Sequence, residues 1–240
     1  MRADSSSATP RRDAGDTKAH DRARWATWLL GLGALLTIAA LWSSWQQLQL
    51  VQDLARGANV PDVTIEASDA RQQLFAFAQI GLGLVSAIVF LVWTATLTKR
   101  LIDLGVTDMR YAPKWSVLGF LIPILNLFRP YQVMSELWKA SEIVPGPEDP
   151  RAKKPTPMIV TLWFGLLLID NLVGRLASGT TFDTMEQVLQ SARLTVLSDA
   201  LGVVTALVAL RLVAAIDERL RGSETRLAES PSRAAVVPAV

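Results

Sequence analysis

The chain has 240 residues, of which 50% are hydrophobic and 19% charged, with a formal net charge of +2 and a mean hydropathy of +0.29. It contains no cysteine, which excludes disulfides, thiolate metal sites and thiol nucleophiles. Its single histidine, His20, lies in a charged N-terminal stretch, so imidazole-based chemistry is excluded from the hydrophobic part of the chain.

The first hydrophobic run covers residues 25–45 and carries no charge. A helix of about 20 residues crosses a hydrocarbon core of about 30 Å, so this run predicts a first transmembrane helix. Gly31 and Gly33 near its middle would permit a neighbouring helix to approach closely. Both ends of the run carry tryptophans, as in the aromatic belts of membrane proteins; these are Trp25, Trp28, Trp42 and Trp45.

A second uncharged run covers residues 74–97 and predicts the second transmembrane helix. Before it, Ser68 and Asp69 offer side-chain oxygens for a helix N-cap. Glycine closes helices readily because it adopts the left-handed conformation without steric cost. Helix ends are therefore predicted at the glycines that follow helical runs, which are Gly57, Gly105 and Gly179.

Two further spans are predicted over residues 157–176 and 194–216. Asp183 followed by Glu186 at the third position resembles a capping box and predicts the start of the last helix, which is expected to end near Arg221.

Three stretches lack hydrophobic periodicity. Residues 1–24 and 222–240 are predicted to be disordered cytoplasmic tails. Residues 143–156, rich in proline and charge, are predicted to be a linker. The membrane domain is therefore predicted to cover residues 25–221.

The central segment, residues 112–142, is apolar at its start but interrupted. A helix over 116–128 would be only about 20 Å long, and Pro123 lacks the N–H that an unbroken helix needs. From Pro130 onward, apolar residues recur at the spacing of one helix face, which predicts an amphipathic helix of the kind that lies in a membrane interface.

Lysine and arginine are distributed unevenly along the chain. The two tails hold six and four of them and the connection between the second and third spans holds nine, whereas the other two connections hold two each. Because positive loops stay in the cytoplasm, both termini and the middle connection are predicted to be cytoplasmic. A fifth span in the central segment would place Lys153 and Lys154 outside, so a re-entrant or interfacial segment on the cytoplasmic side is the favoured interpretation.

A specific pattern of aromatic, proline and amide residues runs through the central segment. It consists of Tyr111, Pro113, Trp115, Val117, Ile122, Pro123, Ile124, Asn126, Leu127, Pro130, Tyr131, Gln132, Val133, Met134, Glu136, Leu137, Trp138, Ala140 and Ser141. On these residues the chain resembles the bacterial domain-of-unknown-function (DUF) family 4328 of multi-pass membrane proteins. The resemblance implies a location in the bacterial cytoplasmic (inner) membrane and no known activity. The chain departs from the family pattern at two places. It has Lys114 where the family tends to have glycine, and Leu118, Gly119 and Phe120 where the family tends to have aromatic residues.

Two acids and an amide lie inside the predicted spans: Asp170, Asn171 and Asp199. Both acids lie about 8 Å from the outer ends of their spans, so two antiparallel helices would place them in one layer. Ionisable groups at such positions are costly and are candidate functional residues. Two interpretations stay open. The acids form a proton or cation site, or they form ion pairs with Arg175 and Arg193 that hold the two helices together. The nearby Ser198, Gly202 and Ala206, at four-residue spacing, predict a packing face.

Candidate functional residues of the central segment are Trp115, Pro123, Asn126, Arg129, Pro130, Tyr131, Gln132, Glu136 and Trp138. Asn126 and Arg129, within a proline-broken stretch, are typical of the discontinuous helices of transporters. The alternative is an amide that caps freed backbone groups, with Arg129 reaching a lipid phosphate. The aromatic candidates are predicted to be interfacial anchors.

The sequence thus predicts an all-α integral membrane protein with four transmembrane helices. The favoured function is a non-enzymatic module that binds lipid, a membrane protein partner or a second copy of the chain through residues 112–141. The alternative is a small proton, cation or solute transporter or channel component that uses Asn126, Asp170 and Asp199. The sequence offers no nucleophile–base pair, metal cluster or phosphate loop, so an enzyme ranks third. Neither a cofactor nor a nucleic-acid partner is expected.

Overall fold

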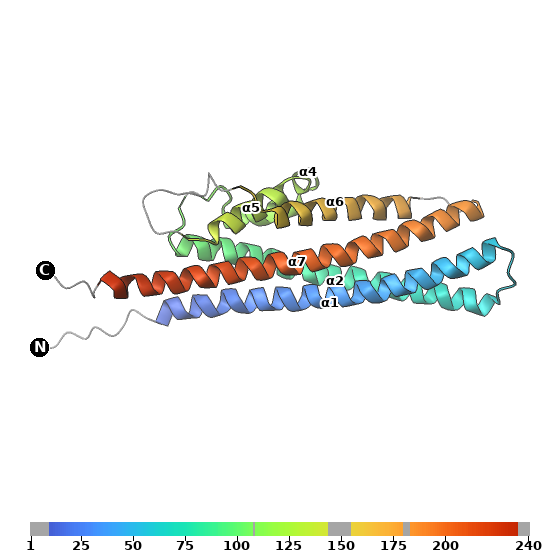
Figure 1. Cartoon of the computed structure of the whole chain (residues 1–240), viewed down its shortest axis with the longest axis horizontal. Helices are drawn as coiled ribbons and strands as arrows, with labels where there is room; N and C mark the ends of the chain where they lie inside the picture. The colour runs from blue at the N-terminus through green and yellow to red at the C-terminus, as the bar shows by residue number, and fades with distance from the viewer. Residues whose placement is uncertain (1–9, 108, 144–154, 180–182, 235–240) are drawn as a thin grey trace, which may run out of the picture. The chain divides into compact units, whose positions relative to one another are not determined.

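The computed structural model describes residues 10–107, 109–143, 155–179 and 183–234, whose regular structure is entirely helical. This confirms the predicted all-α class. The helices within these residues are α1 (Pro10–Ala55), α2 (Asp62–Asp103), α3 (Pro113–Leu121), α4 (Pro123–Asn126), α5 (Arg129–Ala140), α6 (Met158–Ser178) and α7 (Met185–Ala234) (Figure 1).

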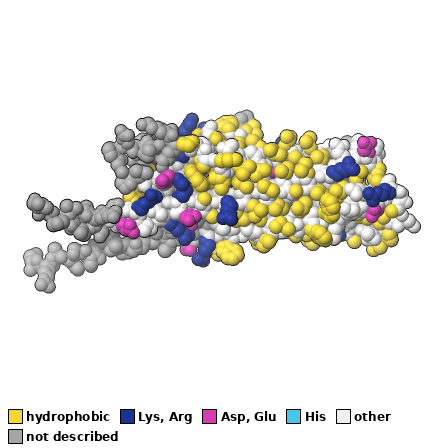
Figure 2. Space-filling view, viewed as in Figure 1, with side chains coloured by type: hydrophobic (Ala, Val, Ile, Leu, Met, Phe, Trp, Pro, Cys, Tyr) yellow, Lys and Arg dark blue, Asp and Glu magenta, His cyan; other side chains and the backbone are white. Residues whose placement is uncertain are grey.

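Four of these helices, α1, α2, α6 and α7, are long and apolar enough to cross a membrane, as the sequence predicts. Their large hydrophobic side chains remain exposed to a degree that a water-soluble bundle avoids. On α2, for example, Phe77 and Ile80 are 73% and 68% exposed. Figure 2 shows hydrophobic side chains over much of the face in view.

The outer helices continue well beyond the predicted spans. Helix α1 begins at Pro10, so residues 10–24 are helical where a disordered tail was predicted, and α7 continues past Arg221 to Ala234. Both flanking sequences contain several Ala and Arg residues, which favour helix even where hydropathy is low. The remaining tail residues and most of the predicted linker, residues 144–154, lie outside the described residues.

The helix ends predicted at glycines are confirmed. Gly57 and Gly105 adopt positive φ angles of 79° and 89°. Beyond Gly105, the N–H of Val106 donates to the carbonyl of Leu101 at 3.0 Å, which is the closure typical of a left-handed glycine after a helix. Helix α6 ends immediately before Gly179.

The helix start predicted at Ser68 and Asp69 is wrong, because α2 already begins at Asp62. Ser68 lies inside the helix, 3% exposed, and its hydroxyl accepts a hydrogen bond from Arg71 at 3.3 Å. The acidic residue that favours the helix N-terminus is Asp62, which follows Pro61 directly.

The capping box of α7 lies one residue further along than Asp183 and Glu186 suggest. The N–H of Gln187 donates to Thr184 Oγ1 at 3.3 Å, and Gln187 Oε1 accepts from the N–H of Thr184 at 3.1 Å. Threonine followed by glutamine at the third position satisfies two of the free N–H groups at a helix start.

The chain divides into two compact units. Unit 1 comprises Met1–Thr27, Val89–Thr161 and Arg211–Val240, and unit 2 comprises Trp28–Ile88 and Leu162–Leu210. Unit 1 holds α3, α4 and α5 together with the adjoining ends of the long helices. Its core consists of apolar side chains that are at most 1% exposed, among them Leu101, Met134, Leu137, Leu212, Ile216 and Leu220.

The central segment breaks at Pro123, as predicted. Ile122 is extended, with φ −83° and ψ 119°, because a residue before proline avoids the helical conformation. Helix α4 is a single turn, and α5 then starts at Arg129 with Pro130 among its first residues. The predicted amphipathic helix is confirmed, since α5 buries one face made of Pro130, Val133, Met134, Ser135, Leu137 and Ala140.

Gly119 sets the distance between α3 and α5. A Cβ atom there would lie 2.8 Å from Arg129 Cβ, which is too close for any native contact. We expect Gly119→Ala to lower the free energy of unfolding by about 1–3 kcal/mol, measured by denaturation in detergent. The matched control is Gly165→Ala in α6, where a Cβ would meet nothing within 4 Å. Equal destabilisation by both substitutions would contradict the close contact.

Candidate functional site

The first candidate site is the polar side of α5 in unit 1. The hydroxyl of Tyr111, a residue only 4% exposed, donates a hydrogen bond to Gln132 Oε1 at 2.6 Å. The carboxylate of Glu136, one turn further along, accepts a hydrogen bond from the backbone N–H of Arg110. Gln132 and Glu136 therefore hold the stretch before α3 against α5.

Two guanidinium groups lie over the ring of Tyr111. The Cζ atom of Arg129 is 4.7 Å from the ring centroid and that of Arg110 is 5.5 Å away, both within the range of cation–π contacts. Arg129 is half-buried, and within the described part of the chain its Nε has no hydrogen-bond partner. The ring thus orients both cations without neutralising them.

Two aromatic residues of α5 contact other helices of the same unit. Hydrogen bonds with Thr161 and Thr156 lower the pKa of the Tyr131 phenol. The guanidinium of Arg219 from α7 lies 4.8 Å from the ring centroid of Trp138. Tyr131 and Trp138, predicted to be interfacial anchors, therefore have intramolecular contacts that periodicity alone does not reveal.

The remaining candidates of the central segment are dispersed. Asn126 ends α4 and is exposed, and within the described residues its amide forms no hydrogen bond, so it does not cap freed backbone there. The carbonyl of Ile122 is satisfied instead by the backbone N–H of Asn126 at 2.8 Å. The side chains of Trp115 and Pro123 lie outside the described part of the structure.

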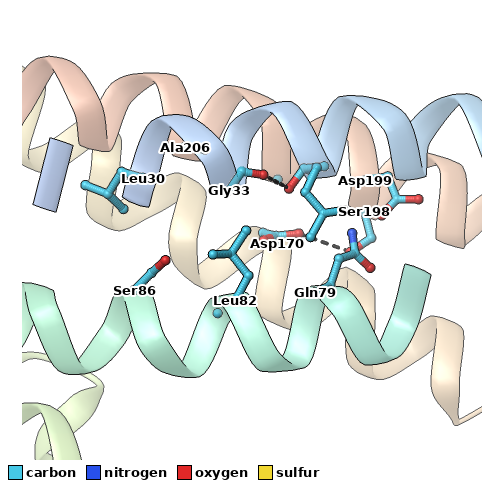
Figure 3. Close-up of a pocket in the computed structure, with 13 residues that line it drawn as sticks. Leu30, Gly33, Gln79, Leu82, Ser86, Asp170, Ser198, Asp199 and Ala206 are labelled. Atoms are coloured by element: carbon cyan, nitrogen blue, oxygen red, sulfur yellow. Dashed lines mark hydrogen bonds between the residues drawn. The ribbon is translucent and has the colours of Figure 1, made fainter. Parts of the chain in front are cut away.

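The second candidate site is a cavity of about 360 Å³ inside unit 2 (Figure 3). All four long helices contribute to its wall, and Asp170 of α6 and Asp199 of α7 both line it. We call it the carboxylate cavity. The sequence predicted that the two acids lie in one layer, and in the structure both acids line the same cavity.

Each acid of the carboxylate cavity accepts a hydrogen bond from a hydroxyl. Ser198 Oγ donates to Asp170 Oδ1 at 3.0 Å, and Ser44 Oγ of α1 donates to Asp199 Oδ2 at 2.6 Å. Gln79 of α2 lies on the same side of the cavity as the acids (Figure 3). All four long helices thus contribute to the part of the cavity that holds the two acids.

The ion pairs considered from the sequence do not form among the described residues. Arg175 and Arg193 are both exposed, and neither pairs with Asp170 or Asp199. Arg175 follows Asp170 by five positions and Arg193 precedes Asp199 by six. A helix rotates by about 100° per residue, so these spacings turn the arginines to faces about 140° and 120° away from the acids.

Asn171 belongs to neither candidate site. It is exposed, and its amide Nδ2 donates to the carbonyl of Leu167 one turn earlier, at 2.7 Å. Adjacent positions on a helix face different directions, so Asp170 lines the carboxylate cavity while Asn171 does not.

The small residues of α7 were predicted to be a packing face, but Ser198, Gly202 and Ala206 all line the carboxylate cavity. Among them, Gly202 does lie close to another helix, because a Cβ there would be 3.3 Å from Thr37 Cγ2. By contrast, a Cβ at Gly33 would meet nothing within 4 Å. The glycines of this site chiefly leave space open.

A family model described as a domain of unknown function, DUF4328, matches residues 56–218, which is more than half of the chain. The chain belongs to the DUF4328 family. No curated protein and no solved structure matches it. The matched residues of this DUF4328 protein include the central segment and the cavity-lining parts of α2, α6 and α7, and leave out α1.

Several residues of the carboxylate cavity in the DUF4328 protein were missed by the sequence reasoning. They are the polar residues of the first two spans, Thr37 and Ser44 of α1 and Gln79 and Ser86 of α2. The members of each pair are seven positions apart, which places them on one helix face, and this spacing is the signal that would have found them. Among the described residues, no group of three or more acidic or histidine side chains is placed to hold a metal ion.

Proposed function

We propose that the DUF4328 protein spans a bacterial cytoplasmic membrane four times, with both termini and the central segment on the cytoplasmic side. The four long apolar helices and their exposed hydrophobic side chains support the spans. The distribution of Lys and Arg supports the orientation. Helix α3 has nine residues, a length of about 14 Å, which suits a re-entrant or interfacial segment better than a fifth span.

We infer that the carboxylate cavity binds a cation or protons and that the protein is a component of a small transport system. The observation that supports this most strongly is the charge of the cavity. Two carboxyl groups line it, and its described lining residues include no Lys, Arg or His. An ionised carboxylate away from water is costly unless a cation or a proton compensates its charge.

The hydrogen bonding of the two acids leaves room for such a ligand. A carboxylate has about four lone-pair sites. Among the described residues, Ser198 donates to one oxygen of Asp170, whereas Ser44 and Gln79 both donate to Asp199. The buried hydroxyl oxygen of Ser86, which also lines the cavity, has no hydrogen-bond partner among the residues that the structure describes. The cavity therefore offers several unused oxygen acceptors to a cation.

The test is proton and monovalent-cation flux into liposomes that contain the purified protein. The double variant Asp170→Asn with Asp199→Asn keeps the shape of both side chains and removes their charge, so we expect it to abolish the flux. The matched control is Asn171→Ala, which changes the exposed neighbour of Asp170 and should leave the flux unchanged. Flux that persists in the double variant would contradict the proposal.

A second candidate function is the binding of lipid or a partner protein through residues 112–141. The observation that favours it is the guanidinium group of Arg129, which no acid neutralises among the described residues. The exposed Asn126 is not part of the carboxylate cavity, so we assign it no role in transport. Neither candidate function is enzymatic.

A further inference from the structure

We infer that Arg110 and Arg129 form a binding site for a phosphate group beside the start of α5. The site is separate from the carboxylate cavity. Only the suggestion that the phosphate belongs to a lipid headgroup rests on the lipid-binding role proposed for the central segment. Three features of the described residues support it: unpaired charge, a fixed geometry and the end of a helix.

The first feature is unpaired positive charge. Two other arginines of unit 1 do have acidic partners, since Arg100 Nε lies 3.0 Å from Glu224 Oε1 and Arg219 Nη2 lies 2.6 Å from Glu142 Oε2. Arg129 has no such partner among the described residues, although it is half-buried and its Nε is inaccessible to solvent. A half-buried guanidinium group without an acidic partner is costly, so an anion that accepts hydrogen bonds from its other N–H groups would stabilise this arrangement.

The second feature is a fixed geometry. Two guanidinium groups lie 4.7 Å and 5.5 Å from the centroid of one ring, that of Tyr111. The ring itself is held by the hydrogen bond from its hydroxyl to Gln132. The nearby acid Glu136 accepts a hydrogen bond from the backbone N–H of Arg110. Because planar guanidinium groups pair with phosphate through two parallel hydrogen bonds, two of them held in this way favour a phosphate over a singly charged carboxylate.

The third feature is the end of a helix. Arg129 is the first residue of α5, whose N-cap residue, Phe128, provides no side-chain hydrogen bond. The positive end of a helix dipole attracts anions. This field acts in addition to the two arginine charges, and the amphipathic α5 is the helix predicted to lie at a membrane surface. A lipid headgroup and a soluble phosphate would present the same chemistry here.

The test is binding to the purified full-length protein in a neutral detergent. The two probes are dihexanoyl phosphatidylglycerol and inorganic phosphate, each measured by calorimetry. We expect Arg129→Gln to weaken binding of the preferred probe by at least about tenfold, since it removes a paired charge–charge contact. The matched control is Lys114→Gln, an exposed cation of α3 outside the ring contact, which should change binding by less than about twofold.

The outcomes separate the sources of the phosphate. Binding of the lipid alone, lost in Arg129→Gln, supports a headgroup site, and equal binding of inorganic phosphate supports a soluble ligand. Absence of binding by both probes, or binding that Arg129→Gln and Arg110→Gln leave unchanged, overturns the inference. Arg110→Gln keeps the test valid if Arg129→Gln does not fold, because the side chain of Arg110 is exposed. The Asp170→Asn and Asp199→Asn variants should bind both probes normally. Failure of the cation proposal can therefore be distinguished from failure of the phosphate inference.

Discussion

We expect Gly83→Leu to abolish cation flux while leaving the protein folded. Gly83 lines the carboxylate cavity, and a Cβ atom there would meet nothing within 4 Å. The added side chain therefore starts in open space and extends into the cavity, and replacing a helical glycine favours the helix by up to about 1 kcal/mol. The measurement is cation flux into liposomes, together with the thermal unfolding midpoint of the same preparation in detergent.

The matched control for this prediction is Gly81→Leu. Gly81 lies two positions earlier on the same helix and also has open space around it, but it does not line the cavity. Its variant makes the same chemical change and should transport normally. Loss of flux in both variants would indicate a general effect on α2, and unchanged flux in Gly83→Leu would show that the cavity is not the path or the site.

Leu137→Ala is expected to lower the free energy of unfolding by about 2–5 kcal/mol. Leu137 is 1% exposed and lies at the middle of the buried face of α5, beside the equally buried Val133 and Met134. Truncation leaves a cavity that the surrounding helices fill only in part. The measurement is chemical denaturation in detergent, followed by tryptophan fluorescence.

The control for Leu137→Ala is Leu127→Ala, at a residue that is 62% exposed between α4 and α5. Surface substitutions of this kind usually change stability by less than about 0.5 kcal/mol. A large loss at Leu127 in detergent would show that the turn between these helices is packed more tightly than its exposure indicates. A small loss at Leu137 would contradict the assignment of α5 to the core of unit 1.

The arginines show how far sequence reasoning about the site extends. The depths of Asp170 and Asp199 along their spans suffice to place them in one layer, because depth follows from position along a helix alone. Whether Arg175 and Arg193 reach them depends on the rotation of each helix about its axis. In the structure the acids instead accept hydrogen bonds from Ser198 and from Ser44 of another helix.

The sequence by itself determined the four apolar helices, the break at Pro123, the amphipathic α5 and the helix ends at Gly57 and Gly105. Each of these follows from local chemistry: the length of an apolar run, the missing N–H of proline or the left-handed conformation of glycine. Only the tertiary structure decided that small residues surround a cavity and that two guanidinium groups share one tyrosine ring. Those features depend on which faces of separate helices meet, and a shift of one residue rotates a helix face by about 100°.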